Sequence, residues 1–566
     1  MFTQRPLLPT HRQAEARAIG RRTHQVLLLS AATGVCVGLA VVVLQKVTFD
    51  ALLEPLLRRP LWMQAVAPGV GLLIAWLCLR WLADRATPTT TDSYIRNFHE
   101  EAHDRLSHKP VLGRVLAGVA TIGYGGALGL EGPAIYTGAS VGSALQRRFS
   151  RFFSREDAKL LMVAGAAAGM AALFKAPATG ALFAIEVPYR SDIARRNVLP
   201  AMVAAAAGYV TFAAVEGTDP LLPIGGDLSF GLIDLAGAAL VGLVCGGGAR
   251  LFSIALRILR ERVMDHVPIG VRLVGAGAVL AVLALVTDAA ADRQLDLGPG
   301  IDLIGWAMDP GRGQFLLLLL LVARVVAVLA TVGGGGVGGL VIPLVAMGAV
   351  TGRLAGGVFG TADDSALLLV VGMAAFFGAG YRTPLAAVMF VAEATGSVGF
   401  VVPALVATAA AQLVVGDESV SAHQRAGRLG HLERRFELPI SAVLETDVRT
   451  VPPDATIEEF LTVHLVGYRQ RAVAVVENGN RYLGLAVLDE VVAIRREAWA
   501  TTEIRTIARV TVPRGRTTWL VRDAVRAMES ADTDVLPVVD GDDRFVGVVT
   551  TEGVLRLDEI LERTGG

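Results

Sequence analysis

The sequence predicts an α-helical polytopic membrane protein followed by a water-soluble α/β module. Of the 566 residues, 53% are hydrophobic and 18% are charged. The two kinds of residue separate along the chain. Apolar runs of roughly 20 residues, long enough to cross a bilayer, fill residues 25–415, whereas residues 439–566 have an ordinary soluble composition. We therefore expect one membrane unit and one aqueous unit.

A basic arm precedes the expected membrane unit. Residues 1–24 are polar and basic, and residues 25–425 hold the apolar runs. Because positively charged loops tend to stay on the cytoplasmic side, we expect an integral, multi-pass protein of a bacterial-type plasma membrane, with its N-terminus and its C-terminal module in the cytoplasm. The arginines behind this orientation are Arg12, Arg17, Arg21, Arg22, Arg147, Arg148, Arg151 and Arg155.

Several classes of protein have no support in the sequence. The formal net charge is zero, so a general affinity for nucleic acid is not expected. Cys36, Cys78 and Cys245 lie in apolar segments without the spacing of metal ligands, which favours buried thiols. The chain carries no nucleophile motif, P-loop or dinucleotide-binding glycine motif. We therefore expect no enzyme activity, no catalytic residue and no metal site.

The membrane part contains an internal repeat. Each copy carries a G-L-x-x-P stretch, then GMAA, then a proline that a glutamate follows nine residues later. These elements are residues 129–133 and 339–343, GMAA from Gly169 and from Gly372, and the pairs Pro177/Glu186 and Pro384/Glu393. The sequence thus predicts a duplication with halves near residues 30–215 and 230–415. Broken apolar segments at matching places in two halves indicate a binding site near the bilayer midplane.

One carboxylate stands at the first of these breaks. Glu131 lies within GYGGALGLEGP, residues 123–133, between Gly129 and the pair Gly132–Pro133. Proline at the first turn and glycine at the margin indicate that one helix ends here and another begins. An ionisable group within a membrane segment indicates function, and the alternative is a glutamate that only caps a helix end.

The pattern changes again from about residue 439. Short strand-like runs such as AVAVV and VLPVVD alternate with amphipathic helical runs. Two copies are visible: the first opens at Thr450 and ends in a strand at Gly484, and the second opens at Val510 and ends at Gly547. Residues 439–566 are therefore predicted to form a duplicated α/β module.

These motifs resemble the CLC family of chloride channels and proton-coupled anion exchangers over roughly residues 25–425, and the C-terminal copies resemble a CBS-domain pair. The resemblance rests on GLEGP around Glu131, GGVGGLVIP ending at Pro343, the PATGALFAIE and PLAAVMFVAE segments, and GDESVSAHQ at 416–424. It implies an inverted-repeat CLC-like fold and a homodimer in the lipid bilayer with one pore in each subunit. Helix N-termini would converge on chloride or another small anion.

The resemblance also implies roles for individual residues. Glu131 matches the family's gating glutamate, which also accepts a proton. Leu340, Val341 and Ile342 match the stretch whose backbone amides face the anion. The polar run at 87–92 matches the family's serine loop, with Pro88 where the serine usually stands, and a plain polar turn is the alternative. The anion-binding residues implied are Gly129, Leu130, Gly132, Thr87, Pro88, Thr89, Leu340, Val341, Ile342 and Ser421.

Three further positions depart from the family's pattern. Leu130 replaces the usual basic residue, which removes positive charge from the outer vestibule. Ser421 replaces the tyrosine that closes the inner end of the central site, so a wider inner mouth is expected. Val187 occupies the position at which exchangers commonly carry a second, internal proton-transfer glutamate. Glu186 and Glu393 are interpreted as structural acids.

Two of the departures decide the leading hypothesis. Since Val187 and Ser421 remove an internal proton donor and an inner barrier, we expect a voltage-gated chloride channel of the CLC type, gated by Glu131. The alternative is a proton-coupled exchanger of chloride, nitrate or fluoride. A third hypothesis, a nucleotide-sensing protein that uses the membrane part as an anchor, is disfavoured because an anchor needs only one or two plain spans.

CBS pairs can bind adenine nucleotides, and the resemblance therefore implies a possible cofactor. The usual ribose-contacting pattern is incomplete in both copies, because the second lacks the final aspartate after Thr550 and the first lacks the threonine before Glu490. Thr550 and Glu490 are the candidate nucleotide contacts. The alternative is a structural or dimerising module without a nucleotide.

Overall fold

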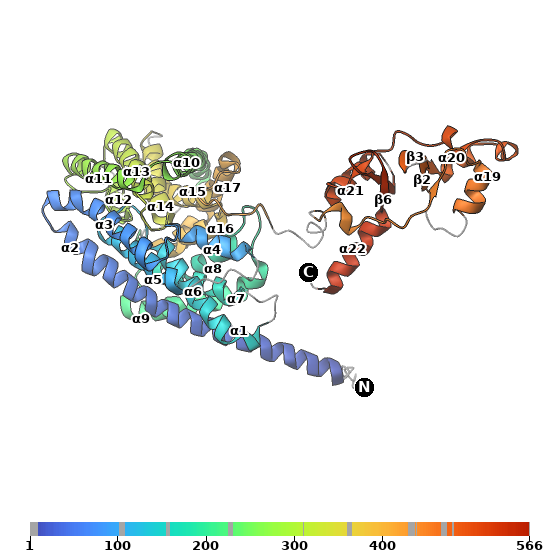
Figure 1. Cartoon of the computed structure of the whole chain (residues 1–566). Helices are drawn as coiled ribbons and strands as arrows, with labels where there is room; N and C mark the ends of the chain where they lie inside the picture. The colour runs from blue at the N-terminus through green and yellow to red at the C-terminus, as the bar shows by residue number, and fades with distance from the viewer. Residues whose placement is uncertain are drawn as a thin grey trace. The chain divides into compact units, whose positions relative to one another are not determined.

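The computed structural model describes residues 10–100, 108–153, 159–224, 230–309, 311–358, 365–427, 436, 438–465, 472–477, 480–531 and 533–564. The chain divides into two compact units, Met1–Gly427 and Arg428–Gly566 (Figure 1). The first unit is helical, and the second contains all the strands that the structure describes.

The helices of the first unit differ widely in length. They are α1 (Thr10–Gln45), α2 (Glu54–Leu57), α3 (Leu61–Leu82), α4 (Thr91–His99), α5 (His108–Gly123), α6 (Glu131–Arg148), α7 (Leu160–Phe174), α8 (Pro177–Glu186), α9 (Val198–Glu216), α10 (Leu232–Ile258), α11 (Ile269–Ala291), α12 (Ile301–Ala307), α13 (Gln314–Gly333), α14 (Val341–Val358), α15 (Ser365–Tyr381), α16 (Pro384–Thr395) and α17 (Val401–Val415). The π-helical turns η1 (Lys46–Leu53) and η5 (Leu259–Met264) extend α1 and α10.

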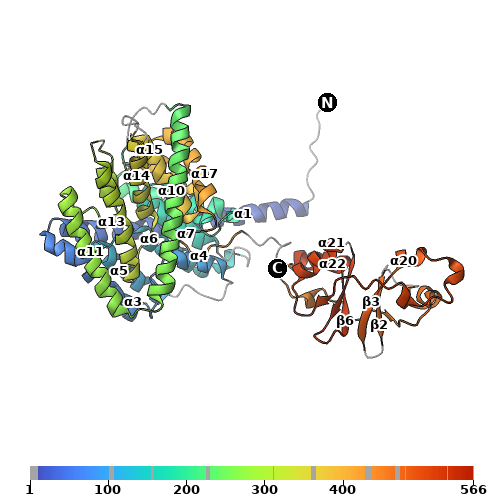
Figure 2. The same cartoon turned by 90° about the horizontal axis from the view of Figure 1, so that it is seen from above.

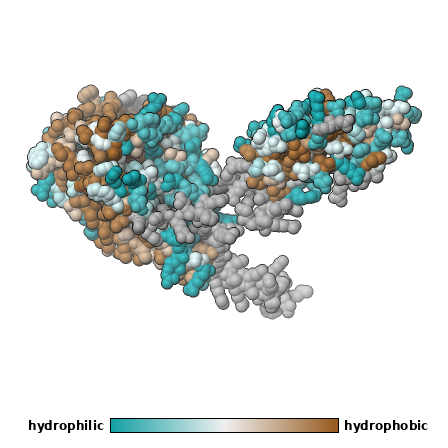
Figure 3. Space-filling model, viewed as in Figure 1, coloured by the Kyte–Doolittle hydropathy of each residue, from teal (hydrophilic) through white to brown (hydrophobic). Residues whose placement is uncertain are grey.

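Among the described residues, seven helical segments are long and apolar enough to cross a membrane. Their outward faces expose large apolar side chains, such as those of Leu232, Phe315 and Leu413. Figure 3 shows hydrophobic residues spread over much of the visible surface of this unit. Such a surface is stable in lipid and would not be stable in water. The length and composition of these helices confirm the predicted membrane unit.

The shorter helices lie inside this unit and are broken where the sequence predicts. Pro177 and Pro384 stand in the first turns of α8 and α16. Lys175 closes α7 in the left-handed conformation, with φ of 53°. Irregular backbone of this kind is tolerated in a membrane only where protein or a polar cavity surrounds it.

The repeat is visible in how the short helices pack. In the first half α6 crosses α7, and in the second half α14 crosses α15. Both crossings depend on glycine, because a Cβ on Gly138 would collide with the backbone of Gly165, and a Cβ on Gly348 would collide with that of Gly372. Equivalent close approaches in the two halves confirm the duplication.

The two structural acids also match across the halves. Glu186 ends α8 and accepts hydrogen bonds from the amides of Leu385 and Ala386, at 3.2 and 3.0 Å, in the first turn of α16. Glu393 on α16 accepts from the amides of Ala178 and Thr179, at 2.9 and 2.8 Å, in the first turn of α8. Each acid therefore caps the helix that carries the other, and their structural role is confirmed.

The second unit consists of two copies of one motif. Each copy has a three-stranded sheet in which the first pair of strands is parallel and the second pair is antiparallel. The strands are β1 (Thr450–Val451), β2 (Ala472–Glu477) and β3 (Arg481–Val487), then β4 (Gly515–Arg516), β5 (Val535–Val539) and β6 (Phe545–Thr550). The helices are α19 (Ile457–Glu459), α20 (Leu488–Val492), α21 (Val521–Ser530) and α22 (Thr551–Thr564).

The two sheets of the second unit pack against each other. Leu485 and Ala474 of the first copy share a buried cluster with Val535 and Val548 of the second, and Figure 2 shows β2 and β3 beside β6. The register also shifts at the same place in both copies, between Val475 and Val476 and between Val538 and Val539. The predicted α/β duplication is confirmed.

Candidate functional site

The two membrane halves meet backbone to backbone beside Glu131. Gly129 and Gly339 exchange two hydrogen bonds, with N–O distances of 3.0 and 2.7 Å. A Cβ on either glycine would collide with the Glu131 carboxyl group. This contact brings the N-terminus of α6 next to the N-terminus of α14, so the two G-L-x-x-P stretches predicted from the repeat form one place in the fold.

Glu131 lies across this junction. It is the first residue of α6, and its side chain is fully buried. One carboxylate oxygen accepts hydrogen bonds from the backbone amides of Val341, at 2.6 Å, and Ile342, at 3.4 Å. The other oxygen, Oε2, accepts none within the described part of the chain. The carboxylate therefore occupies a helix N-terminus, which is a place suited to an anion.

A buried arginine that the sequence analysis missed lies within electrostatic range of Glu131. Arg324 on α13 has no exposed surface, and it donates hydrogen bonds to the carbonyls of Asp296, at 3.1 Å, Gly298, at 2.8 Å, and Pro299. Its signal in the sequence was a single arginine within an apolar span. Leu130, which lacks the usual positive charge, is itself buried.

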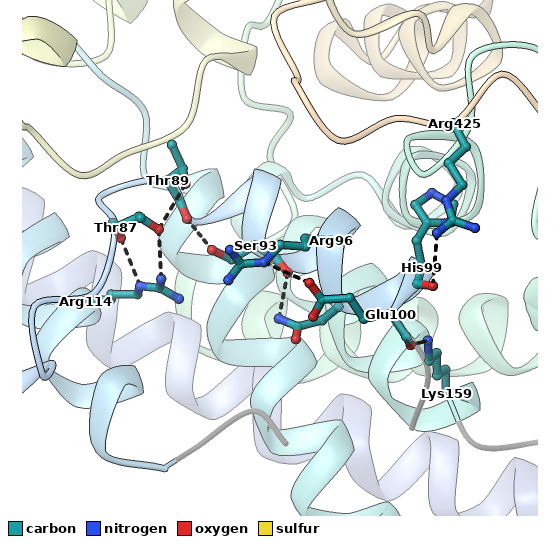
Figure 4. Close-up of polar contacts among 10 residues, drawn as sticks. Thr87, Thr89, Ser93, Arg96, His99, Glu100, Arg114, Lys159 and Arg425 are labelled. Carbon is teal, nitrogen blue, oxygen red and sulfur yellow. Dashed lines mark hydrogen bonds and ion pairs between the residues drawn. The ribbon is translucent and has the colours of Figure 1, made fainter. Parts of the chain in front are cut away.

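The predicted loop residues Thr87, Pro88 and Thr89 have no described bond to Glu131, and residues that come after them in the chain lie closer to it. Thr87 is exposed, and Arg114 holds its carbonyl and its hydroxyl, both at 3.1 Å. Thr89 is half-buried and lies 3.4 Å from the Thr87 hydroxyl (Figure 4). Pro88 between them is also half-buried. None of these three residues has a hydrogen bond to Glu131 among those described.

Thr90 and Thr91 are the hydroxyls of the loop that face the site. A Cβ on Gly132 would collide with the Thr90 hydroxyl, so Thr90 lies directly against the first turn of α6. Both threonine hydroxyls are buried and unpartnered within the described residues. Thr90 and Thr91, rather than the predicted Thr87, Pro88 and Thr89, are therefore the loop residues that lie at the site. The physical reason is that α4 begins at Thr91, which turns these two residues inward.

Ser421 lies against the first turn of α4. Its hydroxyl donates a hydrogen bond of 2.5 Å to Oδ1 of Asp92. The other oxygen of Asp92 lies 3.4 Å from the Arg260 guanidinium on η5. The small side chain of Ser421 is thus paired with a buried carboxylate, and the wider inner mouth stays a prediction.

A tyrosine that the sequence analysis missed faces the same region. Tyr381, the last residue of α15, is buried, and its ring packs edge-on against that of Phe183, at 5.4 Å between centroids. Its hydroxyl approaches Thr91 and the backbone of Leu340 without completing a hydrogen bond to the Thr91 hydroxyl. A phenol from α15 thus lies near the site, although the family's usual tyrosine is absent at position 421.

The position of the second proton-transfer glutamate is apolar and closed. Val187 is fully buried at the end of α8. Its carbonyl accepts a hydrogen bond of 2.8 Å from the Gln424 side chain, which also donates at 2.7 Å to the carbonyl of Tyr381. The Val187 side chain itself therefore cannot carry a proton.

The two candidate nucleotide residues of the second unit already have partners. The Thr550 hydroxyl donates to Glu445 at 3.0 Å and accepts from the Gly553 amide at 3.0 Å. Glu490 accepts a hydrogen bond of 2.7 Å from Arg509. No described hydrogen bond joins Thr550 to Glu490, so these contacts do not by themselves form a ligand site.

A carboxylate buried at the junction of two duplicated membrane halves indicates a binding site within the membrane. The chain matches the family model described as voltage gated chloride channel over residues 70–416, and the CBS domain model over residues 440–496 and 510–559. The first match covers more than half of the chain, and the chain belongs to the voltage-gated chloride channel, or CLC, family.

Curated relatives share about a quarter of the matched residues. The H(+)/Cl(−) exchange transporter ClcA of Vibrio cholerae is 28% identical over 307 residues, which is 52% of this chain and 64% of that protein. The ClcA of Citrobacter koseri is 26% identical over 321 residues, which is 53% of this chain and 64% of that protein. The match therefore spans less than two thirds of the length of these relatives.

Solved structures share the fold. A CLC-type fluoride/proton antiporter aligns with a TM-score of 0.60 and 22% identity, over 72% of this chain and 98% of that one. A slow cyanobacterial Cl−/H+ antiporter aligns with 0.60 and 20%, over 69% and 94%. A eukaryotic CLC transporter aligns with 0.61 and 18%, over 94% and 98%. The membrane unit therefore has the inverted-repeat CLC fold that the sequence predicted.

Proposed function

We propose that the chain is a proton-coupled exchanger of small anions, with chloride as the first candidate, in which Glu131 is both the gate and a proton acceptor. One observation carries the proposal. The Glu131 carboxylate sits on the backbone amides of Val341 and Ile342, where a helix N-terminus offers unpaired donors and a partial positive charge.

The gating step follows from this geometry. The ionised carboxylate occupies the amides that an anion would use, and so excludes that anion. Protonation on Oε2, the oxygen that accepts no hydrogen bond in the described part, removes the negative charge. The neutral side chain then has little to hold it on the amides, and a mobile anion replaces it. Gate opening is thereby linked to the uptake of one proton.

The surroundings favour brief rather than tight anion binding. Thr90 and Thr91 offer hydroxyl donors that are buried and otherwise unused among the described residues. Arg324 supplies positive charge at a distance, because its own hydrogen bonds go to carbonyl groups. Neutral donors can partly replace the water around an anion without the strong attraction of a direct ion pair, which favours release as well as entry.

Exchange is favoured over simple conduction because the curated relatives quoted above are named as H(+)/Cl(−) exchange transporters. The sequence alone favoured a channel. One observation still supports that second candidate, namely the apolar Val187 at the position of the usual internal proton donor.

Flux measurements in proteoliposomes test the proposal. In the wild-type chain a chloride gradient should drive protons across the membrane in the direction opposite to chloride. The reversal potential should shift with the pH gradient. Glu131→Gln should abolish proton movement and remove the pH dependence of anion flux, because glutamine resembles the protonated acid but does not titrate. Glu54→Gln is the matched control, since Glu54 also begins a helix but is exposed.

Two outcomes would reject parts of the proposal. A wild-type reversal potential that ignores the pH gradient would leave the channel as the function. An unchanged pH dependence in Glu131→Gln would remove Glu131 from the mechanism. Repeating the assay with nitrate and fluoride would decide the anion, since the loop and the Ser421 position differ from the usual chloride site.

The assembly and its voltage response belong to the same proposal. We propose a homodimer, in keeping with the resemblance, and a transport rate that depends on membrane voltage. Cross-linking in native membranes should give a species of twice the monomer mass. Currents across a voltage series should change with voltage more steeply than the driving force alone requires.

A further inference from the structure

We propose that Asp92 is the inner acid that exchanges protons with Glu131, in place of the carboxylate that is absent at Val187. This inference rests on the proposed proton-coupled exchange. It assigns to α4 a proton-transfer role that neither the sequence motifs nor the comparisons indicate.

Asp92 is a buried acid beside a more exposed partner. Its side chain is 8% exposed, whereas that of its partner Arg260, 3.4 Å away, is 25% exposed. Arg260 is fixed by a second hydrogen bond of 3.0 Å to the carbonyl of Val420. The ion pair therefore runs from the accessible Arg260 to the buried Asp92, and a proton reaching Asp92 need cross only this pair.

The helix that carries Asp92 is held at both ends. At its start, Arg114 binds Thr87, and the Ser93 hydroxyl donates to the Thr89 carbonyl at 2.6 Å. At its end, Lys159 donates to the carbonyls of Phe98, at 2.7 Å, and Glu100 (Figure 4). Asp92 is thus positioned by a fixed helix rather than by a mobile loop.

The residues just before Asp92 connect it to the gate. Thr90, two residues before Asp92, lies directly against Gly132, the residue after Glu131, because a Cβ on Gly132 would collide with the Thr90 hydroxyl. Asp92 and Glu131 therefore border one interior region. The hydroxyls of Thr90 and Thr91 open toward this region and are unpartnered in the part of the chain that the structure describes. Buried hydroxyls with unused hydrogen-bonding capacity are suited to holding one or two bridging waters.

The proton step balances without another reactant. A proton from water binds the Asp92 carboxylate, which becomes a neutral acid and loses its ion pair with Arg260. The proton then passes through the hydroxyls and bridging water to Oε2 of Glu131. Asp92 returns to its ionised form and recovers Arg260. The described polar groups facing Asp92 are Arg260 on η5, Ser421 near the end of the unit and Tyr381 on α15.

Three other acids of the unit are bonded differently. Asp296 is buried and accepts a hydrogen bond of 2.6 Å from the Thr287 hydroxyl on one oxygen. Glu186, which is buried, and Glu393, which is half-buried, each accept backbone hydrogen bonds on both oxygens. Protonating either acid would weaken the cap of a helix. Asp92, in contrast, is bound by one hydroxyl and one partly exposed guanidinium, which can be released and recovered without breaking backbone hydrogen bonds.

Paired measurements of proton and chloride flux in proteoliposomes containing the full chain test the inference. Asp92→Asn should lower proton movement by about 100-fold or more, the usual scale for loss of a proton-transferring group, while chloride flux continues. Asp92→Glu should restore proton movement. Glu418→Gln, which removes a neighbouring half-buried carboxylate paired with Arg257, should behave as wild type.

The outcomes separate this inference from the proposed function. If wild type moves protons and Asp92→Asn keeps the same proton-to-chloride ratio, the assignment of Asp92 is wrong and the exchanger stands. If wild type moves no protons, both are wrong. If Glu186→Gln rather than Asp92→Asn stops the protons, the inner acid is Glu186.

A second variant covers the case in which Asp92→Asn fails to fold. Arg260→Gln keeps the acid but removes its ion-pair partner. The proton-to-chloride ratio of this variant should differ from that of wild type, because Asp92 no longer returns to the same ion pair. A ratio identical to that of wild type would overturn the inference.

Discussion

Three glutamates in the membrane unit, two buried and one half-buried, bind helix N-termini, but they do so in two different ways. Glu186 and Glu393 form a symmetric pair, and each uses both carboxylate oxygens to cap the helix that carries the other. Glu131 has no counterpart in the second half and uses only one oxygen. The symmetric acids join helices of the two halves, and the asymmetric acid keeps one oxygen without a hydrogen bond in the described part of the chain.

The two halves also contribute different groups where Gly129 meets Gly339. The first half supplies the charge of Glu131, and the second half supplies the amides of Val341 and Ile342. Gly129 and Gly339 bring the two together by a pair of backbone hydrogen bonds. A duplicated chain therefore builds a single site, because one copy of the G-L-x-x-P stretch carries the acid and the other carries none.

The largest effect on transport is expected from a substitution that crowds the Glu131 carboxylate. In Gly339→Ala the new methyl group would lie 2.5 Å from the Glu131 carboxyl carbon. Overpacking costs roughly 1–3 kcal/mol. The conformation in which Glu131 accepts hydrogen bonds from Val341 and Ile342 should therefore lose about ten- to hundredfold in population. Anion flux should become nearly independent of pH in the proteoliposome assay.

Gly305→Ala is the matched control for this prediction, since a Cβ at Gly305 meets no atom within 4 Å. If Gly339→Ala retains the pH dependence of wild type, the seated carboxylate is not what limits anion flux.

An intermediate effect is expected for the symmetric acids. Glu393→Ala would leave the amides of Ala178 and Thr179 without their acceptor, at a cost of about 1–3 kcal/mol. The melting temperature in detergent should fall, and Glu186→Ala should give a similar fall because it removes the equivalent cap. Glu54→Ala, at an exposed helix start, should leave the melting temperature unchanged. A fall for only one of the two caps would break the symmetry inferred here.

The smallest effect is expected in the second unit. Adenine nucleotide, if it binds the CBS pair as the resemblance implies, should raise the melting temperature of the full chain. Thr550→Ala should reduce that shift, and by itself should cost about 1 kcal/mol through loss of its hydrogen bond to Glu445. Titration of ATP and AMP by calorimetry provides the measurement, and the absence of binding to wild type would favour a purely structural module.

Much of the site could be predicted from the sequence because its key parts are local. The duplicated G-L-x-x-P stretches, the single acid at Glu131 and the amides of Val341 and Ile342 each lie within a few neighbouring residues. The two C-terminal copies could be found for the same reason. Repeats are recognisable in one sequence, and a carboxylate at a glycine-rich helix break needs no tertiary contact to be noticed.

The sequence by itself thus determined the membrane class, the duplication and the position of the Glu131 carboxylate, whereas only the tertiary structure decided what surrounds that carboxylate. Asp92 and Ser421 are 329 residues apart and meet only after packing. Which threonines turn inward depended on the residue at which α4 begins, and the contributions of Tyr381 and Arg324 come from separate helices. Local patterns fix where a helix breaks, but the partners of a buried charge are fixed by the fold, since a buried charge must find them wherever packing brings them.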